Sequence, residues 1–171
     1  MCIRDRSGSL GYIDAKFQKY ITNIASVPTD VAAFRKVQNT PAWTGNAQAS
    51  YTADLGEGSL IATAGISFKS KTYQFEIPNP YLDQDAYQLV DASLVYTAPG
   101  KRWTLGLYGK NLFDVQYKTS GYTFMGANAT TGALLTNPTT GALIPALGKE
   151  GTLTAFYGNP RQVFVTATVN F

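Results

Sequence analysis

The chain has 171 residues, 15% of them charged, a formal net charge of +3 and no histidine. The basic residues are dispersed, so no nucleic-acid partner is expected, and the lack of histidine excludes a Ser-His-Asp triad, a Cys-His pair and histidine-based metal sites. No apolar run approaches the about 18 residues of a transmembrane helix. At the amino end, residues 1–6 (MCIRDR) resemble adapter read-through at the front of an assembled gene. They are expected to be a non-native leader ahead of the segment 7–171.

Six segments alternate apolar and polar side chains with the period of two that β-strands have. In the clearest segment, Trp43, Ala47 and Tyr51 share one parity, while Asn46 and Gln48 share the other. The six strands are expected at about residues 8–18, 43–53, 60–73, 87–97, 103–113 and 161–171. Their length suits the about 9 to 11 residues that cross a bilayer in a β-barrel. Alternation alone fits a soluble antiparallel sheet with one face on a core equally well.

Two further features favour a membrane barrel. The apolar parity carries no Lys, Arg, Asp or Glu and has aromatic residues at strand ends, where a barrel has its girdles. Connector lengths alternate as well: the segments 19–42, 74–86 and 114–160 are long, and the two connectors between them are short. Because outer-membrane barrels have short periplasmic turns and long outer loops, the C-terminus is expected in the periplasm. The aromatic residues at strand ends are Phe17, Trp43, Tyr51, Phe68, Tyr96, Trp103 and Phe171.

The polar parity is expected to face the inside of the barrel, where polar side chains are tolerated. Six strands cannot enclose a lumen, since about eight are needed even around packed side chains. The fold is therefore predicted to be all-β, an antiparallel meander of about six transmembrane strands that forms an incomplete segment of a larger barrel. The residues assigned to the lumen are Tyr12, Asp14, Lys16, Asn46, Gln48, Lys69, Asp91, Tyr108 and Lys110.

Four stretches carry a family resemblance: residues 39–51 (NTPAWTGNAQASY), 85–96 (DAYQLVDASLVY), 103–117 (WTLGLYGKNLFDVQY) and 157–171 (YGNPRQVFVTATVNF). Together they resemble the C-terminal part of a TonB-dependent outer-membrane receptor. The resemblance implies the last six of 22 strands around a plug, in the outer membrane of a Gram-negative bacterium. The most specific motif residues are Asn111, Leu112, Phe113, Asp114, Tyr117, Pro160 and Arg161.

The resemblance also implies a function. Such a receptor actively imports a scarce small-molecule ligand, such as a ferric siderophore, and its partners are outer-membrane lipid, the plug, the remaining strands and TonB. The plug and the segment that contacts TonB have no counterpart here. Because residues 1–6 lack the features of a signal peptide, the natural start is expected to be missing. Two alternatives stay open: a passive porin or structural outer-membrane barrel, and a soluble β-domain that binds carbohydrate.

The last segment also predicts an assembly signal. An unbroken apolar stripe, consisting of Val163, Val165, Ala167, Val169 and Phe171, ends on a terminal aromatic residue. Barrels resembling this one display such an end to the barrel-assembly machinery, which can pair with the edge of the last strand. The alternative is that Phe171 is only a girdle residue.

The loops suggest no catalytic chemistry. Asp83 and Asp85 could act as an acid and a base, but they are expected to form a solvated acidic loop. No enzyme, cofactor or metal site is therefore predicted. Two TTGAL runs, at 130–134 and 139–143, surround an Asn-Pro turn and are expected to form one small hairpin. The alternative is a lid that grips a ligand. Loop aromatics expected either to stack on a ligand or to pack on each other are Tyr73, Phe75, Tyr81, Tyr122, Phe124 and Phe156.

Overall fold

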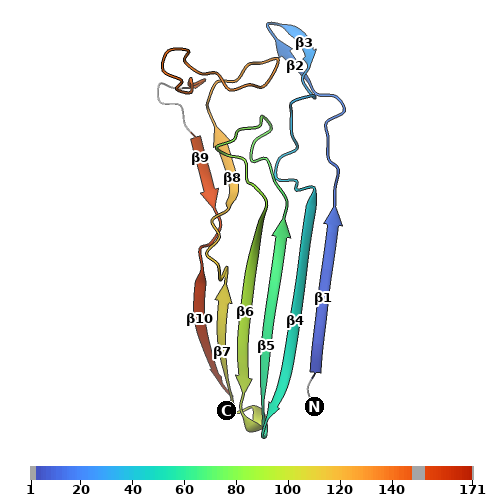
Figure 1. Cartoon of the computed structure of the whole chain (residues 1–171), viewed down its shortest axis with the longest axis vertical. Helices are drawn as coiled ribbons and strands as arrows, with labels where there is room; N and C mark the ends of the chain where they lie inside the picture. The colour runs from blue at the N-terminus through green and yellow to red at the C-terminus, as the bar shows by residue number, and fades with distance from the viewer. Residues whose placement is uncertain (1–2, 148–152, 171) are drawn as a thin grey trace.

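The structure is a computed structural model that describes residues 3–147 and 153–170, and it contains one large antiparallel sheet (Figure 1). The sheet has six strands in the order β1-β4-β5-β6-β7-β10, and its two end strands do not pair with each other. The predicted all-β antiparallel architecture is confirmed, and the barrel is open. The strands are β1 (Ile3–Tyr12), β4 (Trp43–Leu55), β5 (Gly58–Lys69), β6 (Tyr87–Thr97), β7 (Trp103–Lys110) and β10 (Gln162–Val169).

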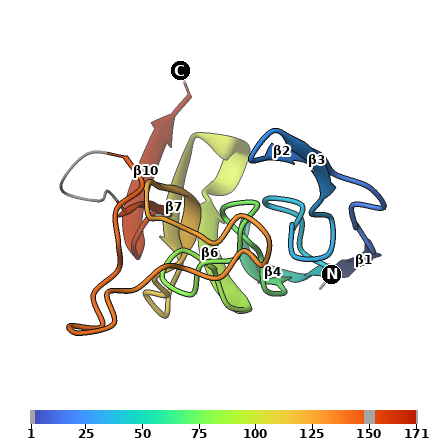
Figure 2. The same cartoon turned by 90° about the horizontal axis from the view of Figure 1, so that it is seen from above.

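The connectors differ in length at the two ends of the sheet. At one end, a tight turn with Gly56 at φ 62° joins β4 to β5, and the 3-10 turn η1 (Pro99–Lys101) lies between β6 and β7. All the long connectors lie at the other end of the sheet (Figures 1 and 2). We name this end the outer end and these connectors the outer loops. Two of them contain small ladders of their own: β2 (Ile21–Ile24) with β3 (Val27–Asp30), and β8 (Lys118–Thr123) with β9 (Leu153–Tyr157). None of the helical structure among residues 3–147 and 153–170 has the length and apolar character needed to cross a membrane.

The first strand lies earlier in the chain than its expected range of 8–18. It runs from Ile3 to Tyr12, and residues 13–18 lie outside it. Alternation in residues 11–17 misled the prediction, because the strand position is set by pairing with β4, in which Tyr12 is opposite Trp43 and Gly8 is opposite Ala47. Residues 3–6 therefore belong to the sheet, whereas their non-native origin stays a prediction.

The remaining strands lie near their expected ranges. The bounds of β6 coincide with the expected 87–97, and those of β4, β5 and β10 differ by a few residues. The seventh strand stops at Lys110 because Asn111 has a left-handed φ of 48°, which a continuing strand cannot adopt.

Directly paired residues of antiparallel strands share a face, so the register separates two surfaces. The polar face carries Asn46, Gln48, Thr63, Ser67, Lys69, Asp91, Ser93, Tyr108, Lys110 and Thr166. The apolar face carries Trp43, Ala47, Ala49, Ile66, Leu94, Leu105, Leu107, Val163, Val165 and Val169.

No hydrophobic core covers the apolar face in the part of the chain that the structure describes. Leu107 is 47% exposed, and Val163 and Val165 are each 64% exposed. The buried hydrophobic residues of the described chain are Val31 and Leu82 in the outer loops and Ala98 beside η1. A soluble sheet of this size would bury its apolar face, so this arrangement favours lipid as the missing neighbour.

Candidate functional site

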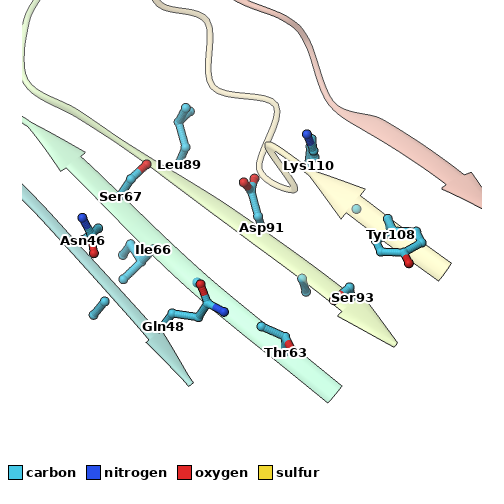
Figure 3. A pocket seen from close by; sticks show the side chains of 14 residues that line it. Asn46, Gln48, Thr63, Ile66, Ser67, Leu89, Asp91, Ser93, Tyr108 and Lys110 are labelled. Carbon is cyan, nitrogen blue, oxygen red and sulfur yellow. The ribbon is translucent and has the colours of Figure 1, made fainter. Parts of the chain in front are cut away.

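A pocket of about 310 Å³ lies on the polar face of strands β4 to β7 (Figure 3). Five residues predicted to face the lumen line it together: Asn46, Gln48, Asp91, Tyr108 and Lys110. They converge because the strand register places all five on the same face of the sheet. Amide, hydroxyl, carboxylate and ammonium groups are thus concentrated on one side of the sheet.

Three other residues assigned to the lumen lie elsewhere. Tyr12 is on the apolar face, where its ring contacts that of Trp43 at 4.6 Å between centroids. Asp14 and Lys16 follow the end of β1 and form an exposed ion pair with an N–O distance of 2.8 Å. The hydrogen bond from Lys16 to Asp14 raises the pKa of the lysine above its usual value. The shifted position of β1 explains all three corrections.

The shifted strand also places two cations on the apolar face. Arg4 pairs with Tyr51, with the guanidinium carbon 5.8 Å from the ring centroid, and Arg6 pairs with Ala49. A basic side chain facing lipid at the bilayer midplane costs about 2 to 4 kcal/mol. Both arginines belong to the segment expected to be a non-native leader.

Lys69 lies on the polar face but lines a second pocket, of about 580 Å³, where the sheet meets the outer loops. Asn46 lies between the two pockets and lines both. Lys118 from β8 is also in the lining, and Gln74 contributes an Oε1 atom that is buried without a hydrogen-bond partner among the described residues. No carboxylate lines this second pocket, so its charged side chains are both cationic.

The outer loops are packed rather than loose. Arg35 forms an ion pair with Glu76, and the Tyr20 hydroxyl donates to the other carboxylate oxygen of Glu76 at 3.0 Å. The Arg35 guanidinium also lies over the rings of Tyr20 and Phe34, at 5.0 and 5.6 Å from their centroids. These contacts connect the segment 19–42 to the segment 74–86.

Of the two acidic residues in the segment 74–86, Asp83 has a structural role. Asp83 is 9% exposed, lies 3.6 Å from the Lys71 ammonium and accepts a hydrogen bond from the Asn79 N–H. Asp85 is exposed, so the expectation of a solvated loop fits Asp85 and not Asp83. The Lys118 ammonium donates a hydrogen bond to the Asp83 carbonyl at 3.0 Å, which connects this loop to β8.

Four of the six loop aromatics contact one another or lysines. Tyr122 contacts Phe124 and Phe156, at centroid distances of 5.6 and 6.3 Å. Tyr73 has the ammonium groups of Lys36 and Lys71 at 5.7 and 5.4 Å from its ring centroid. Of the two readings of these aromatics, mutual packing therefore fits Tyr122, Phe124 and Phe156.

The family-motif residues Asn111, Asp114, Tyr117 and Arg161 meet in one corner at the outer end of β7. The Asn111 side chain accepts from the Val115 N–H and donates to the carbonyls of Val115 and Asn159. The Asp114 carboxylate accepts from the Arg161 N–H at 2.8 Å, although 47 positions separate the two residues. This corner holds the start of β10 against the end of β7.

Three other motif residues have less prominent places in the corner. Leu112 covers Gly109, and its N–H donates to the Val90 carbonyl at 2.9 Å. Phe113 is 72% exposed, and Pro160 lines a pocket beside Asp114. The motif residues thus have a structural role: they connect the end of β7 to the start of β10.

Asp91 has a defined partner that sequence reasoning missed. Its carboxylate accepts a hydrogen bond from the Asn111 N–H at 2.8 Å. Asp91 therefore supports the turn at the end of β7, in addition to lining the polar-face pocket. The link was hidden in the sequence because it depends on strand register.

A stacked aromatic pair on the polar face was also missed. The rings of Tyr108 and Phe164 are 5.0 Å apart and nearly parallel, at 11°. An added Cβ at Gly106 would lie 2.6 Å from Tyr108 Cε2, so only glycine leaves room for this ring. Phe164 breaks the polar parity of the last strand, and that break is the signal that could have found the pair.

The predicted assembly stripe lies on the apolar face as far as it is described. Val163, Val165, Ala167 and Val169 all pair with apolar-face residues of β7. Phe171 lies outside the described residues. Within residues 3–147 and 153–170, no cluster of three or more His, Cys, Asp or Glu side chains could hold a metal ion.

The two TTGAL runs do not form one hairpin. Each run closes a turn of its own: Ala127 bridges to Leu134, and Thr136 bridges to Leu143. The physical reason is that Asn128 and Asn137 each cap the following Thr-Thr-Gly turn with their side-chain oxygen, which makes two separate local turns.

Comparison with known proteins gives one family. A sequence model described as TonB dependent receptor-like, beta-barrel, matches residues 4–112, which is more than half of the chain. No solved structure matches the chain. The match covers β1 and β4 to β7 and ends within the motif corner, at Leu112. The chain therefore belongs to the TonB-dependent receptor-like β-barrel family.

Proposed function

We propose that this chain is the C-terminal barrel segment of an outer-membrane receptor that imports a scarce small-molecule ligand, such as a ferric siderophore, with energy delivered through TonB. The family match supports the receptor class. The observation that carries the proposal is the sheet of strands β4 to β7 and β10, whose apolar face is covered by no hydrophobic core of the described residues. In the complete receptor, outer-membrane lipid covers this face.

The position of the long connectors supports the orientation. They all lie at one end of the sheet, and the short connectors lie at the other end, beside the end of β10 (Figure 1). Outer-membrane barrels have their long loops outside the cell. The C-terminus of this chain then lies in the periplasm, where the barrel-assembly machinery binds the stripe of Val163, Val165, Ala167, Val169 and Phe171.

The polar face is the wall against which the plug packs. Asn46, Gln48 and Tyr108 have groups that donate or accept hydrogen bonds with a plug or with water. The plug, the other barrel strands and TonB are the partners of the complete receptor.

The second pocket suggests where the ligand first contacts this segment. It lies between the polar face and the outer loops, and its charged lining residues are Lys69 and Lys118. A ferric siderophore with net negative charge is complementary to such a lining.

Uptake of radioiron-labelled ferric hydroxamates and ferric catecholates by cells with the complete receptor tests this function. We expect uptake that stops when TonB is deleted. Uptake that continues without TonB would indicate a passive porin and contradict active transport. Lys69→Glu should lower uptake, while Lys101→Glu, at the opposite end of the sheet, should leave it unchanged.

A further inference from the structure

The outer loop between β8 and β9 contains a tandem sequence repeat, with residues 127–135 (ANATTGALL) followed by residues 136–144 (TNPTTGALI). The two copies fold in the same way. Glycine closes each turn in a left-handed conformation, with φ 71° at Gly132 and φ 70° at Gly141. The loop therefore presents the same structural unit twice.

The hydrogen bonds of the two copies correspond one to one. In the first copy, the Asn128 side chain accepts from Thr130 and Thr131, both at 2.9 Å, and its carbonyl accepts from the Gly132 N–H at 2.8 Å. In the second copy, Asn137 accepts in the same way from the following Thr-Thr-Gly, at 2.8, 3.2 and 2.8 Å.

A ring of backbone hydrogen bonds fixes the two copies to each other. Gly126 donates to the Ile144 carbonyl, Leu135 donates to the Gly126 carbonyl, and Ile144 donates to the Leu135 carbonyl, at 2.7, 2.9 and 2.9 Å. Both turns are thus already folded before a further partner binds. A preformed surface loses little conformational entropy when it binds a partner.

The copies differ in what covers their glycines. An added Cβ at Gly132 would lie 2.9 Å from Phe34 Cε2, so the Phe34 ring occupies the space above this glycine. At Gly141, no atom of the described residues lies within 4 Å of the same position. Gly132 is buried and Gly141 is exposed. An aromatic ring therefore packs on the first copy, whereas none of the described residues packs on the second.

The two copies also point to different sides of the molecule. In Figure 2, the loop first crosses the middle of the molecule and then turns back to the side of β10. The first copy meets Phe34 on this path. Figure 1 shows the same return toward that side. The free edge of β10 is there, where the closed barrel proposed above continues.

We propose that the second copy binds an aromatic side chain from the outer loop that neighbours β10 in the closed receptor, in the way that the first copy binds Phe34. Neither copy contains a charged residue, so an uncharged ring suits the site. The contact would join the outer loops across the closing seam of the barrel. It rests on barrel closure and not on the identity of the ligand.

Photo-crosslinking on intact cells tests the proposal, using the complete receptor with benzoylphenylalanine in place of Ala142 or Ala133. The probe at Ala133, beside the occupied glycine, should capture the segment around Phe34 and serves as the control. The probe at Ala142 should capture an aromatic-containing outer loop of the same polypeptide. Capture of a different polypeptide, or capture only within residues 118–157, would overturn the proposal.

Glycine variants give a second test, read as the rate at which an external protease cleaves the loop on intact cells. Gly132→Ala in a Phe34→Ala background measures the backbone strain alone, because the two glycines have nearly the same φ. Gly141→Ala in the otherwise native receptor should accelerate cleavage beyond that baseline, by about the same factor as Gly132→Ala does with Phe34 present. A rate equal to the baseline would contradict the proposal. Heat-modifiable gel mobility, measured first, reports barrel closure separately, and a receptor that never closes would contradict the proposed function instead.

Discussion

The ring of Tyr117 lies directly on Gly158, leaving no room for a Cβ atom, and the Gly158 N–H donates to the Tyr117 carbonyl at 2.9 Å. The same ring stacks on Tyr87 at 4.7 Å. Tyr117 therefore connects the outer end of β6 to the residues that lead into β10. The long outer loop has a fixed base at this point.

Gly158→Ala should weaken that base, because the new methyl group would displace the Tyr117 ring. We expect a lower unfolding temperature of the complete receptor, measured by gel mobility after heating. The double variant Tyr117→Ala with Gly158→Ala removes the ring as well and should recover part of the loss. No recovery in the double variant would mean that the close contact is not the cause.

Asn111 should be the most sensitive residue of the motif corner. Asn111 is 4% exposed and its side chain makes three hydrogen bonds, so Asn111→Ala should cost at least about 1 to 3 kcal/mol. Denaturant-induced unfolding of the receptor in detergent measures this loss. Asn111→Gly accommodates the φ of 48° without the side chain. A variant Asn111→Gly as stable as the wild type would show that only the backbone conformation matters.

The hairpin of β2 and β3 should respond to acid through Asp30. The backbone N–H groups of Ala32 and Tyr20 donate to its carboxylate at 3.0 and 3.1 Å and lower the pKa of Asp30 below its usual value. A lowered folded-state pKa gives stability that is present above the unfolded value of 3.8 and is lost as the pH falls through the folded value.

Amide hydrogen exchange at Ala32 and Tyr20 should therefore speed up, after correction for intrinsic exchange, as the pH falls below about 3.8. Asp30→Asn should reduce this pH dependence. Corrected rates that stay constant through this pH range in the wild type would exclude a role for the carboxylate.

Deletion of Phe171 separates its two predicted roles. If the terminal aromatic residue is an assembly signal, pulse-chase labelling of the complete receptor should show slow insertion and accumulation in the periplasm. Normal insertion with only a lower unfolding temperature would leave Phe171 as a girdle residue.

Alternation along the chain predicted the sheet well where both parities were distinct. The segment around Ala47 and Gln48 has a clear apolar and a clear polar side, so its strand and both of its faces were predicted from local sequence. The position of the first strand was predicted wrongly because residues 3–12 mix arginine, serine and glycine without alternation. Only pairing with β4 fixes the position of this strand.

The corner and the loop contacts depend on distant residues. Asp114 with Arg161 and Phe34 with Gly132 are contacts between segments far apart in the chain. The motif residues could be recognised by resemblance, but their hydrogen bonds follow from the strand register and loop packing. Local periodicity contains no information about such contacts.

The central claim is that the apolar face of this sheet lies in lipid and the polar face lies in the lumen of a closed barrel. Heat-modifiable gel mobility of the complete receptor tests it with two pairs of variants, one pair on each face of the same two strands, β4 and β7. Ala47→Lys and Leu107→Lys should impair folding into the membrane, since each lysine would face lipid at a cost of about 2 to 4 kcal/mol near the midplane. Gln48→Lys and Thr104→Lys, on the polar face, should give the folded, heat-modifiable form at the wild-type level. Equal behaviour of the two pairs would contradict the account.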